Sequence, residues 1–192
     1  MTRPTKLITN IACGLGLLGV FALLVVLPQH LEKSHYTFPV GSSLPTAFPV
    51  EATLKWLQPV GKSGVKTSLN ELLKDLPKGA LVNFWATWCP PCLEELPSLE
   101  YLNRQLKKHP NTFPPLITIS VDEKPEDVFT LFKSLDFKVS FTVLYDSEGK
   151  LAQSVGTTKF PETYWISPEG KILYKWVGPQ DWLSPEVLNP LR

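Results

Sequence analysis

Two cysteines three positions apart, Cys89 and Cys92, are the residues of this chain best suited to chemistry. They follow an apolar run at residues 80–85 that predicts a buried strand, and a helical pattern begins directly after Cys89. Cys89 would then lie at a helix N-terminus, where unpaired N–H groups and the helix dipole favour a thiolate. Cys92, one turn further on, would face the protein and could attack a mixed disulfide formed at Cys89. The spacing therefore predicts a redox-active dithiol.

A zinc site and a purely structural disulfide are the alternatives for this cysteine pair. Pro90 and Pro91, between the cysteines, suit the first positions of a helix because proline has no N–H to donate. A structural zinc site usually needs four ligands, and the third cysteine, Cys13, stands in an apolar N-terminal run. The histidines are not at ligand spacing from the pair; they are His30, His35 and His109. We therefore expect no metal and no cofactor beyond the reversible disulfide.

The N-terminal part of the chain predicts a membrane anchor. Residues 7–27 contain no charged residue and are long enough to cross a bilayer. Arg3 and Lys6 precede them, which predicts that residues 1–6 lie in the cytoplasm and that the rest of the chain lies outside it. A cleaved signal peptide is the alternative. Residues 26–30 contain no small-x-small cleavage pattern, so an uncleaved, single-pass signal-anchor of the cytoplasmic membrane is favoured.

The remaining residues divide into a tether and one domain. Residues 28–49 are interrupted by proline, glycine and serine and have no sustained periodicity, which predicts a tether. Residues 50–192 then form the domain that faces the periplasm or another extracytoplasmic space. The formal net charge of the 192 residues is +1, which gives no electrostatic basis for binding nucleic acid.

The domain shows helices that alternate with strands, then a hairpin. Short strand-like pieces within residues 50–65 come first, and a turn at 146–150 leads into residues 151–155. Periodicity, caps and breakers predict helices over about 69–76, 90–108 and 125–135 and from 184, and strands over 80–85, 116–121, 141–145, 163–166 and 171–177. This order predicts an α/β fold with a mixed central sheet flanked by helices.

The chain resembles the thioredoxin superfamily, and within it the membrane-anchored, TlpA-like thiol-disulfide oxidoreductases of cytochrome c maturation (the ResA and CcmG type). The resemblance covers roughly residues 69–178. It rests on Asn-Phe-Trp-Ala-Thr-Trp-Cys-Pro-Pro-Cys at 83–92, on Glu95 and the kink proline Pro97 after it, and on Phe-Pro-Glu-Thr-Tyr at 160–164. The last segment looks like the family's cis-proline segment. The resemblance implies a thioredoxin-like fold.

The resemblance also implies roles around the cysteines. In this family the cis-proline, here Pro161, lies against the two sulfurs and leaves the backbone of the preceding residue, Phe160, free to pair with a substrate strand. An ordinary loop proline is the alternative for Pro161. The residues expected to bind substrate together with Phe160 are Trp88, Pro90, Pro91 and Glu162.

A proton carrier is expected near the buried cysteine. Many relatives carry a buried aspartate six residues before the first cysteine, but this chain has Asn83, which cannot titrate. Glu95, one helical turn after Cys92 and on its side of the helix, is the expected replacement. A carboxyl group partly desolvated beside two thiols would have a raised pKa and could exchange the proton of Cys92. The alternative is that Glu95 is a solvated helix residue.

The function implied by the resemblance is that of a disulfide reductase for envelope proteins. Its substrate would be the haem-binding cysteine pair of apocytochrome c, and its electrons would come from a membrane thiol transporter. Lys159 stands where a glycine is often found in the ResA and CcmG group, which leaves the partner open. A disulfide-donating oxidase or a general envelope reductase would use the same scaffold.

Two alternatives belong to other classes of protein. A metal-handling, thioredoxin-like chaperone would use a three-residue spacing between its cysteines and a downstream histidine, and no histidine follows His109. A non-catalytic binding module is the other alternative, and the intact pair of Cys89 and Cys92 beside Pro161 is contrary to it.

Overall fold

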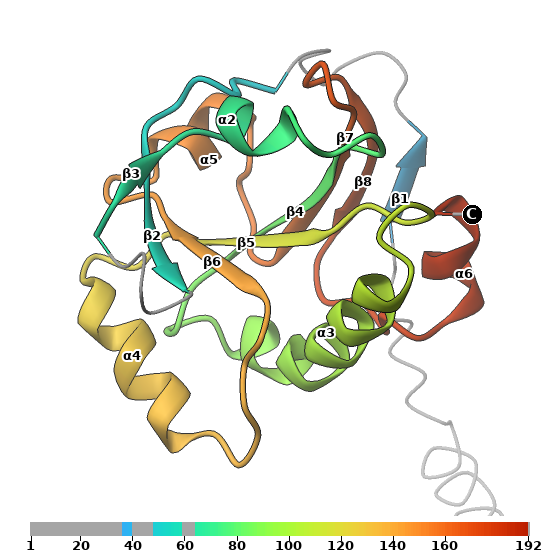
Figure 1. The fold of residues 1–192 in the computed structure, drawn as a ribbon. Helices are drawn as coiled ribbons and strands as arrows, with labels where there is room; N and C mark the ends of the chain where they lie inside the picture. Colours follow the sequence, from blue (N-terminus) through green and yellow to red (C-terminus); the bar gives the residue numbers. More distant parts are fainter. Residues whose placement is uncertain (1–35, 40–47, 59–63, 192) are drawn as a thin grey trace, which may run out of the picture. The chain divides into compact units, whose positions relative to one another are not determined.

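The computed structural model describes residues 36–39, 48–58 and 64–191 (Figure 1). The expected anchor at residues 7–27 lies outside the described residues. Among the helices that are described, none combines the length and the apolar character needed to cross a membrane. The helices are α2 (Leu69–Leu73), α3 (Pro90–Lys108), α4 (Pro125–Ser134), α5 (Lys150–Ser154) and α6 (Pro185–Leu188), followed by the short 3-10 helix η2 (Asn189–Leu191).

The strands form one mixed sheet in the order β1-β8-β7-β4-β5-β6-β2-β3. Neighbours β4, β5 and β6 are parallel, whereas the other pairs of neighbouring strands are antiparallel. The strands are β1 (Tyr36–Pro39), β2 (Leu54–Gln58), β3 (Lys66–Thr67), β4 (Ala80–Trp85), β5 (Leu116–Ser120), β6 (Thr142–Tyr145), β7 (Glu162–Ile166) and β8 (Ile172–Val177). The expected α/β fold with a mixed sheet is confirmed.

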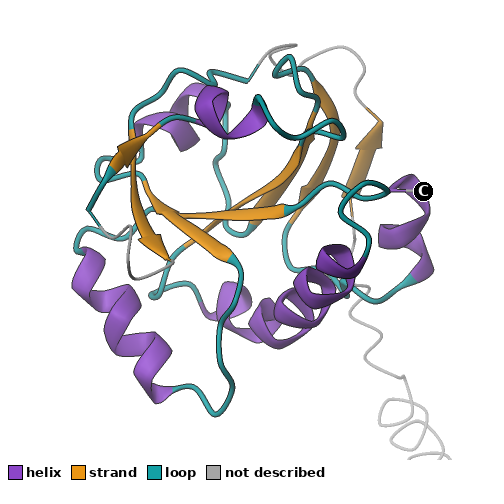
Figure 2. Cartoon of the chain, in the orientation of Figure 1, coloured by secondary structure: helices purple, strands orange, loops and turns teal. Residues whose placement is uncertain are grey.

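Helices cover the sheet on both faces (Figure 2). Strand β4 is buried along its whole length, as expected for a central strand between two layers of helices. Its alternate residues enter two different hydrophobic clusters: Leu81 and Trp85 join α3, α4 and α6, and Val82 and Phe84 join α2 and α5. The period of two along the strand thus separates the two halves of the core.

Local sequence signals set the start of α2 and both ends of α3, whereas α2 ends at Leu73, three residues before its predicted end. The predicted capping box of α2 is present, with Ser68 Oγ accepting from the Glu71 N–H at 3.3 Å and Glu71 Oε2 accepting from the Ser68 N–H at 3.1 Å. Helix α3 has the predicted bounds and contains Pro97, and Lys107 and Lys108 in its last turn complement the helix dipole.

The domain reaches further toward the N-terminus than residue 50. Residues 28–49 were assigned to a tether by composition, yet β1 lies within that range and pairs with β8. Phe48 is also buried, between the rings of Phe84 and Tyr164, and its N–H donates to the Gly170 carbonyl at 2.8 Å. The pairing of β1 with β8 and the hydrogen bond between Phe48 and Gly170 each join residues more than a hundred positions apart, and composition carries no information about such contacts.

Candidate active site

The cysteine pair lies where β4 ends and α3 begins. Cys89 caps the N-terminus of α3 with an extended backbone, and its Sγ accepts a hydrogen bond from the Cys92 N–H at 3.3 Å. The two sulfurs are joined by a disulfide of 2.09 Å. Cys89 keeps 5 % of its surface exposed and Cys92 keeps 1 %. Cys89 is therefore the more accessible cysteine, and Cys92 is the one turned into the protein.

The start of α3 favours negative charge on Cys89. Pro90 and Pro91 occupy the first helical positions, as the sequence predicts. Because proline has no N–H, the first N–H inside the helix is that of Cys92, and it already points to the Cys89 sulfur. The helix dipole adds a partial positive charge at the same place. A thiolate on Cys89 of the reduced protein is thereby stabilised.

Residues 160 and 161 lie beside the cysteine loop. The Phe160–Pro161 peptide bond is cis, as expected from the resemblance. The carbonyl of Pro161 accepts from the Gly178 N–H at 2.9 Å. The ring of Phe160 meets the ring of Trp88 edge to face, with 5.8 Å between the centroids, and it packs on the cluster that contains both cysteines. Tertiary packing thus brings the proline segment to the redox pair.

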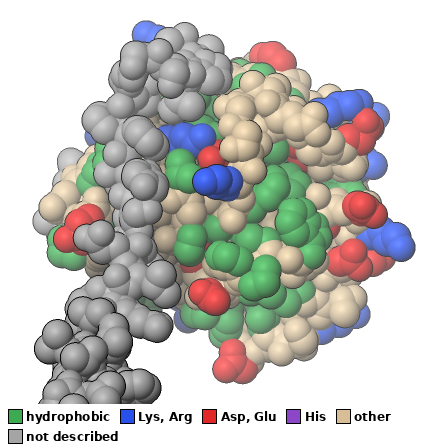
Figure 3. All heavy atoms as spheres, turned by 180° about the vertical axis from the view of Figure 1, so that it is seen from behind, with side chains coloured by type: hydrophobic (Ala, Val, Ile, Leu, Met, Phe, Trp, Pro, Cys, Tyr) green, Lys and Arg blue, Asp and Glu red, His purple; other side chains and the backbone are tan. Residues whose placement is uncertain are grey.

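Trp88 is the most exposed of the large hydrophobic side chains in the described part of the chain, at 60 %. The others with substantial exposure are Val65, Tyr101, Leu173 and Leu183. Seen from behind, one face of the molecule carries a broad area of hydrophobic side chains with charged side chains around its margin (Figure 3). An exposed indole directly before Cys89 is available for contact with another molecule.

Glu95 lies inside the protein, with only 4 % of its surface exposed. Its Oε1 accepts from Asn83 Nδ2 at 3.0 Å, and its Oε2 accepts at 3.1 Å from both the Gln180 N–H and Trp182 Nε1. Burial raises the pKa of Glu95 to about 7, although the three hydrogen bonds act in the opposite direction. The alternative of a solvated helix residue is excluded. A carboxyl with this pKa can hold or release a proton near neutral pH.

Asn83 connects Glu95 to the sheet. Its Nδ2 donates to Glu95 at 3.0 Å and to Thr163 Oγ1 at 2.9 Å. Its Oδ1 is buried and has no hydrogen-bond partner among the described residues. If the amide group turns over, Oδ1 faces the carboxyl instead and can accept from it. Asn83 therefore suits both the ionised and the protonated form of Glu95.

Glu162, expected to bind substrate, has a buried side chain. Its Oε2 lies 2.9 Å from Lys175 Nζ, and the Tyr164 hydroxyl donates to it at 2.9 Å. The exposed fractions of the Glu162 and Lys175 side chains are 3 % and 7 %, so each charge depends on the other for compensation. The structure therefore buries the Glu162 side chain and does not present it on the surface, while the other expected substrate-binding residues lie around the cysteines.

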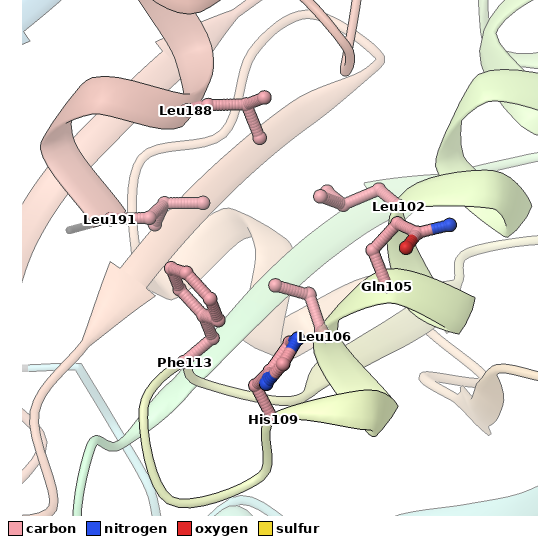
Figure 4. A pocket seen from close by; sticks show the side chains of 7 residues that line it. All are labelled: Leu102, Gln105, Leu106, His109, Phe113, Leu188 and Leu191. Carbon is pink, nitrogen blue, oxygen red and sulfur yellow. The ribbon is translucent and has the colours of Figure 1, made fainter.

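An apolar hollow of about 140 Å³ lies elsewhere, between the C-terminal half of α3 and the end of the chain. Leucines and Phe113 line it together with Gln105 and His109 (Figure 4). Among the described residues that line it there is no cysteine and no carboxylate. Within the described ranges, no group of three His, Cys, Asp or Glu side chains is placed to hold a metal ion.

Comparison with known protein families shows to which family the chain belongs. The family model described as Redoxin matches residues 39–189. The chain belongs to the Redoxin family. The match includes β4, α3 and the cis-proline segment, and therefore the whole of the candidate site.

Curated relatives of this Redoxin chain are named as thiol-disulfide exchange proteins. It is similar to the thiol-disulfide oxidoreductase ResA of Bacillus subtilis, with 33 % identity over 102 residues, 53 % of this chain and 54 % of the relative. It is also similar to the probable thiol:disulfide interchange protein DsbE-2 of Pasteurella multocida, with 28 % identity over 172 residues, 89 % of this chain and 79 % of the relative. The ResA matches thus span between about half and three fifths of those relatives. The resemblance to the ResA and CcmG type is confirmed.

Solved structures confirm the thioredoxin-like fold of this Redoxin domain. A secreted thiol-disulfide isomerase from Corynebacterium glutamicum has a TM-score of 0.61 at 16 % identity, covering 84 % of this chain and 93 % of that one. StoA from Bacillus subtilis has a TM-score of 0.53 at 18 % identity, covering 71 % and 100 %. At these identities the likeness concerns the fold alone.

Sequence patterns missed several residues that hold the Redoxin site together. Asp122 is fully buried and accepts from Thr87 Oγ1 at 2.6 Å, from the Thr87 N–H at 3.0 Å and from Ser120 Oγ at 2.7 Å. It therefore fixes the loop that leads to the first cysteine. One available signal was its position after β5, because the carboxyl ends of neighbouring parallel strands meet at one edge. Gln180 and Trp182 carried no such signal.

Proposed function

We propose that the chain is a protein thiol-disulfide oxidoreductase that acts through Cys89 and Cys92. The observation that supports it most directly is the disulfide between these cysteines at the N-terminus of α3, with a buried carboxyl of pKa about 7 one turn further on. A structural disulfide would need neither the helix N-terminus nor a titratable group beside it.

The exchange takes place in two steps. The Cys89 thiolate of the reduced protein attacks one sulfur of a substrate disulfide, a bond forms between them, and the other substrate sulfur leaves as a thiolate. Cys92, as a thiolate, then attacks Cys89 Sγ. The Cys89–Cys92 disulfide forms and the second substrate sulfur leaves. The substrate has gained two electrons, and the protein has lost them.

Glu95 is the group that takes up the Cys92 proton before the second step. Cys92 is buried and must lose its proton before it can attack. Glu95 follows it by three residues, so both side chains lie on one side of α3. In its ionised form Glu95 accepts the Cys92 proton, and it releases the proton near neutral pH because its pKa is about 7.

The physiological reaction that we propose is reduction of the haem-binding cysteine pair of apocytochrome c. The names of the ResA and DsbE relatives support disulfide exchange, and the cytochrome c substrate is what the family resemblance implies. Residues 7–27 would anchor the domain to the outer face of the cytoplasmic membrane, where the surroundings are oxidising. A membrane thiol transporter would then supply the electrons that return Cys89 and Cys92 to the reduced state.

Replacing the second cysteine tests the proposal. A Cys92→Ala chain should accumulate a mixed disulfide through Cys89, because the step that releases the substrate is lost. We expect covalent adducts from intact cells on non-reducing gels, and their disappearance after addition of a thiol reductant. Cys89→Ala is the matched control and should form none. Absence of any adduct with Cys92→Ala would contradict dithiol exchange.

A further inference from the structure

An open pocket of about 350 Å³ lies next to the redox centre. Trp88, the residue before Cys89, and Phe160, the residue before Pro161, form its aromatic side. The other residues come from the segments that follow β5 and β6, from α5 and, at Thr157, from the segment after α5. Three of them are acidic, Asp122, Glu123 and Glu148, and no basic residue is among the described residues that line it. We call it the acidic pocket.

Hydrogen bonds hold the segment that carries Glu123 next to the segment that carries Trp88. Asp122 accepts from the N–H and the hydroxyl of Thr87, the residue before Trp88. The hydroxyl of Tyr145 donates to the Glu123 carbonyl at 2.8 Å. Since these partners are themselves buried or half-buried, the position of the Glu123 backbone is set before any ligand arrives.

A second set of hydrogen bonds, made by Asp146, fixes the turn that carries Glu148. Asp146 accepts from the N–H groups of Lys150, Leu151 and Ala152, at 3.1, 2.8 and 3.2 Å. The N–H of Asp146 itself donates to the Ser120 carbonyl at 3.0 Å. The turn between β6 and α5 is thereby closed, with Glu148 at its tip. The acidic pocket is a preformed site rather than a gap between loose loops.

The Glu123 and Glu148 carboxylates of the acidic pocket are available to a ligand, whereas the Asp122 carboxylate is buried and accepts from Thr87 and Ser120. Glu123 makes no ion pair within the described part of the chain, and its side chain is exposed. Glu148 pairs with Lys150 at 2.6 Å, but both side chains are mostly exposed, at 63 % and 74 %, so water screens this pair. Lys124 and Lys159 are nearby in the sequence and exposed, and neither lines the pocket.

The aromatic side favours the same kind of ligand. A cation over the face of an indole is attracted by the negative face of the ring. Trp88 offers such a face because it is 60 % exposed and its only described ring contact is the edge-to-face one with Phe160. Carboxylates on one side and an indole on the other complement an alkyl chain that ends in a positive charge.

We propose that the acidic pocket is a subsite for a lysine or arginine side chain of the substrate, close in sequence to the disulfide that is reduced. This inference rests on the proposed oxidoreductase function and adds a substrate class to it: cationic polypeptide segments around the cysteines. An anchored side chain places the substrate disulfide at Cys89 and raises the rate of the first exchange step.

Two disulfide-containing peptides that differ at one position beside a cysteine test the subsite. One carries lysine and the other norleucine, which has the apolar chain without the charge. The second-order rate constant for reduction by the fully reduced 192-residue chain is measured in single-turnover experiments at low ionic strength. We expect the lysine peptide to react about five- to tenfold faster, with a smaller difference in added salt.

The double variant Glu123→Gln/Glu148→Gln should bring the ratio of the two rate constants close to one. Both side chains are exposed, so the fold is retained. Glu94→Gln is the matched control: Glu94 is exposed on α3 near the cysteines, does not line the pocket, and should keep the ratio. Equal rates for the two peptides with the unaltered chain, or an unchanged ratio in the double variant, would overturn the subsite. If neither peptide is reduced, the proposed function itself fails, and this inference fails with it.

Discussion

Glu95 combines two opposing influences at a single carboxyl. Three donors, from Asn83, Gln180 and Trp182, stabilise its ionised form. Removal from water favours the neutral form, and this is the larger influence, so the pKa rises to about 7. Asn83 Oδ1, which has no hydrogen-bond partner among the described residues, can accept from the protonated form of Glu95 once the amide group turns over. This balance is what a proton carrier near neutral pH requires.

The folded-state pKa of Glu95 predicts a pH dependence of stability. The pKa rises from its ordinary value of 4.5 to about 7, so between these values the folded protein binds a proton that the unfolded chain does not. This contribution is present below about pH 4.5 and is lost as the pH rises through about 7. Between pH 5 and pH 8, wild type should therefore lose about 2–3 kcal/mol of unfolding free energy that Glu95→Gln does not lose.

The measurement is urea unfolding of the oxidised protein at both pH values, compared between wild type and variant. Glutamine fits the site because Asn83 can turn its Oδ1 toward the new amide. Glu94→Gln, an exposed change of the same kind on α3, should behave as wild type does. Parallel pH profiles for wild type and Glu95→Gln would show that Glu95 titrates normally.

At the scale of elements, the position of the site depends on how closely the start of β4 approaches β7. The chain turns from α2 into β4 at Gly79, which has a φ of +69°. A side chain there would be strained by this backbone angle, and its Cβ would lie 1.8 Å from the Ile166 carbonyl oxygen of β7. Only glycine lets β4 start this close to β7, and β4 carries Asn83 and leads to Cys89.

Gly79→Ala should therefore lower the unfolding free energy by about 3 kcal/mol or more. Gly156→Ala is the matched control. Gly156 has a similar φ of +76°, but an added Cβ meets nothing within 4 Å, so that variant should lose only about 1 kcal/mol from the backbone angle. Denaturant unfolding monitored by tryptophan fluorescence gives both values. Equal losses would mean that the contact with Ile166 relaxes at no cost.

At the scale of the whole molecule, the property to be predicted is the direction in which electrons flow between the protein and its substrate. The scaffold can reduce or oxidise a substrate, depending on the potential of the Cys89–Cys92 couple. A reductant that works outside the cytoplasm must be supplied with electrons, and this is the role proposed for a membrane thiol transporter. The reductase proposal therefore requires a low potential.

We expect a reduction potential near that of thioredoxin, about −270 mV, when the chain is equilibrated with thiol–disulfide buffers. A value near −120 mV would indicate a disulfide-donating oxidase instead. Cys92→Ala supplies the baseline, because it cannot form the internal disulfide. If wild type forms no disulfide at any buffer ratio, the pair is not a redox centre.

The sequence by itself determined the chemistry and most of the framework. The Cys-x-x-Cys pair, the prolines after the first cysteine and the apolar periods are local patterns, and local geometry converts them directly into a strand, a turn and a helix. The bounds of α3 and the capping box of α2 were predicted for this reason. The proline at 161 was also located, through its resemblance to a family segment.

Only the tertiary structure decided which groups surround the cysteines. Two donors to Glu95 come from Gln180 and Trp182, 85 and 87 positions away in the chain, and no local period encodes such a contact. Burial results from the packing of the whole domain, so only the tertiary structure could show that Glu95 is buried and not solvated. The same reason explains why the Glu162 side chain is buried and how the acidic pocket arises from the segments that follow separate strands.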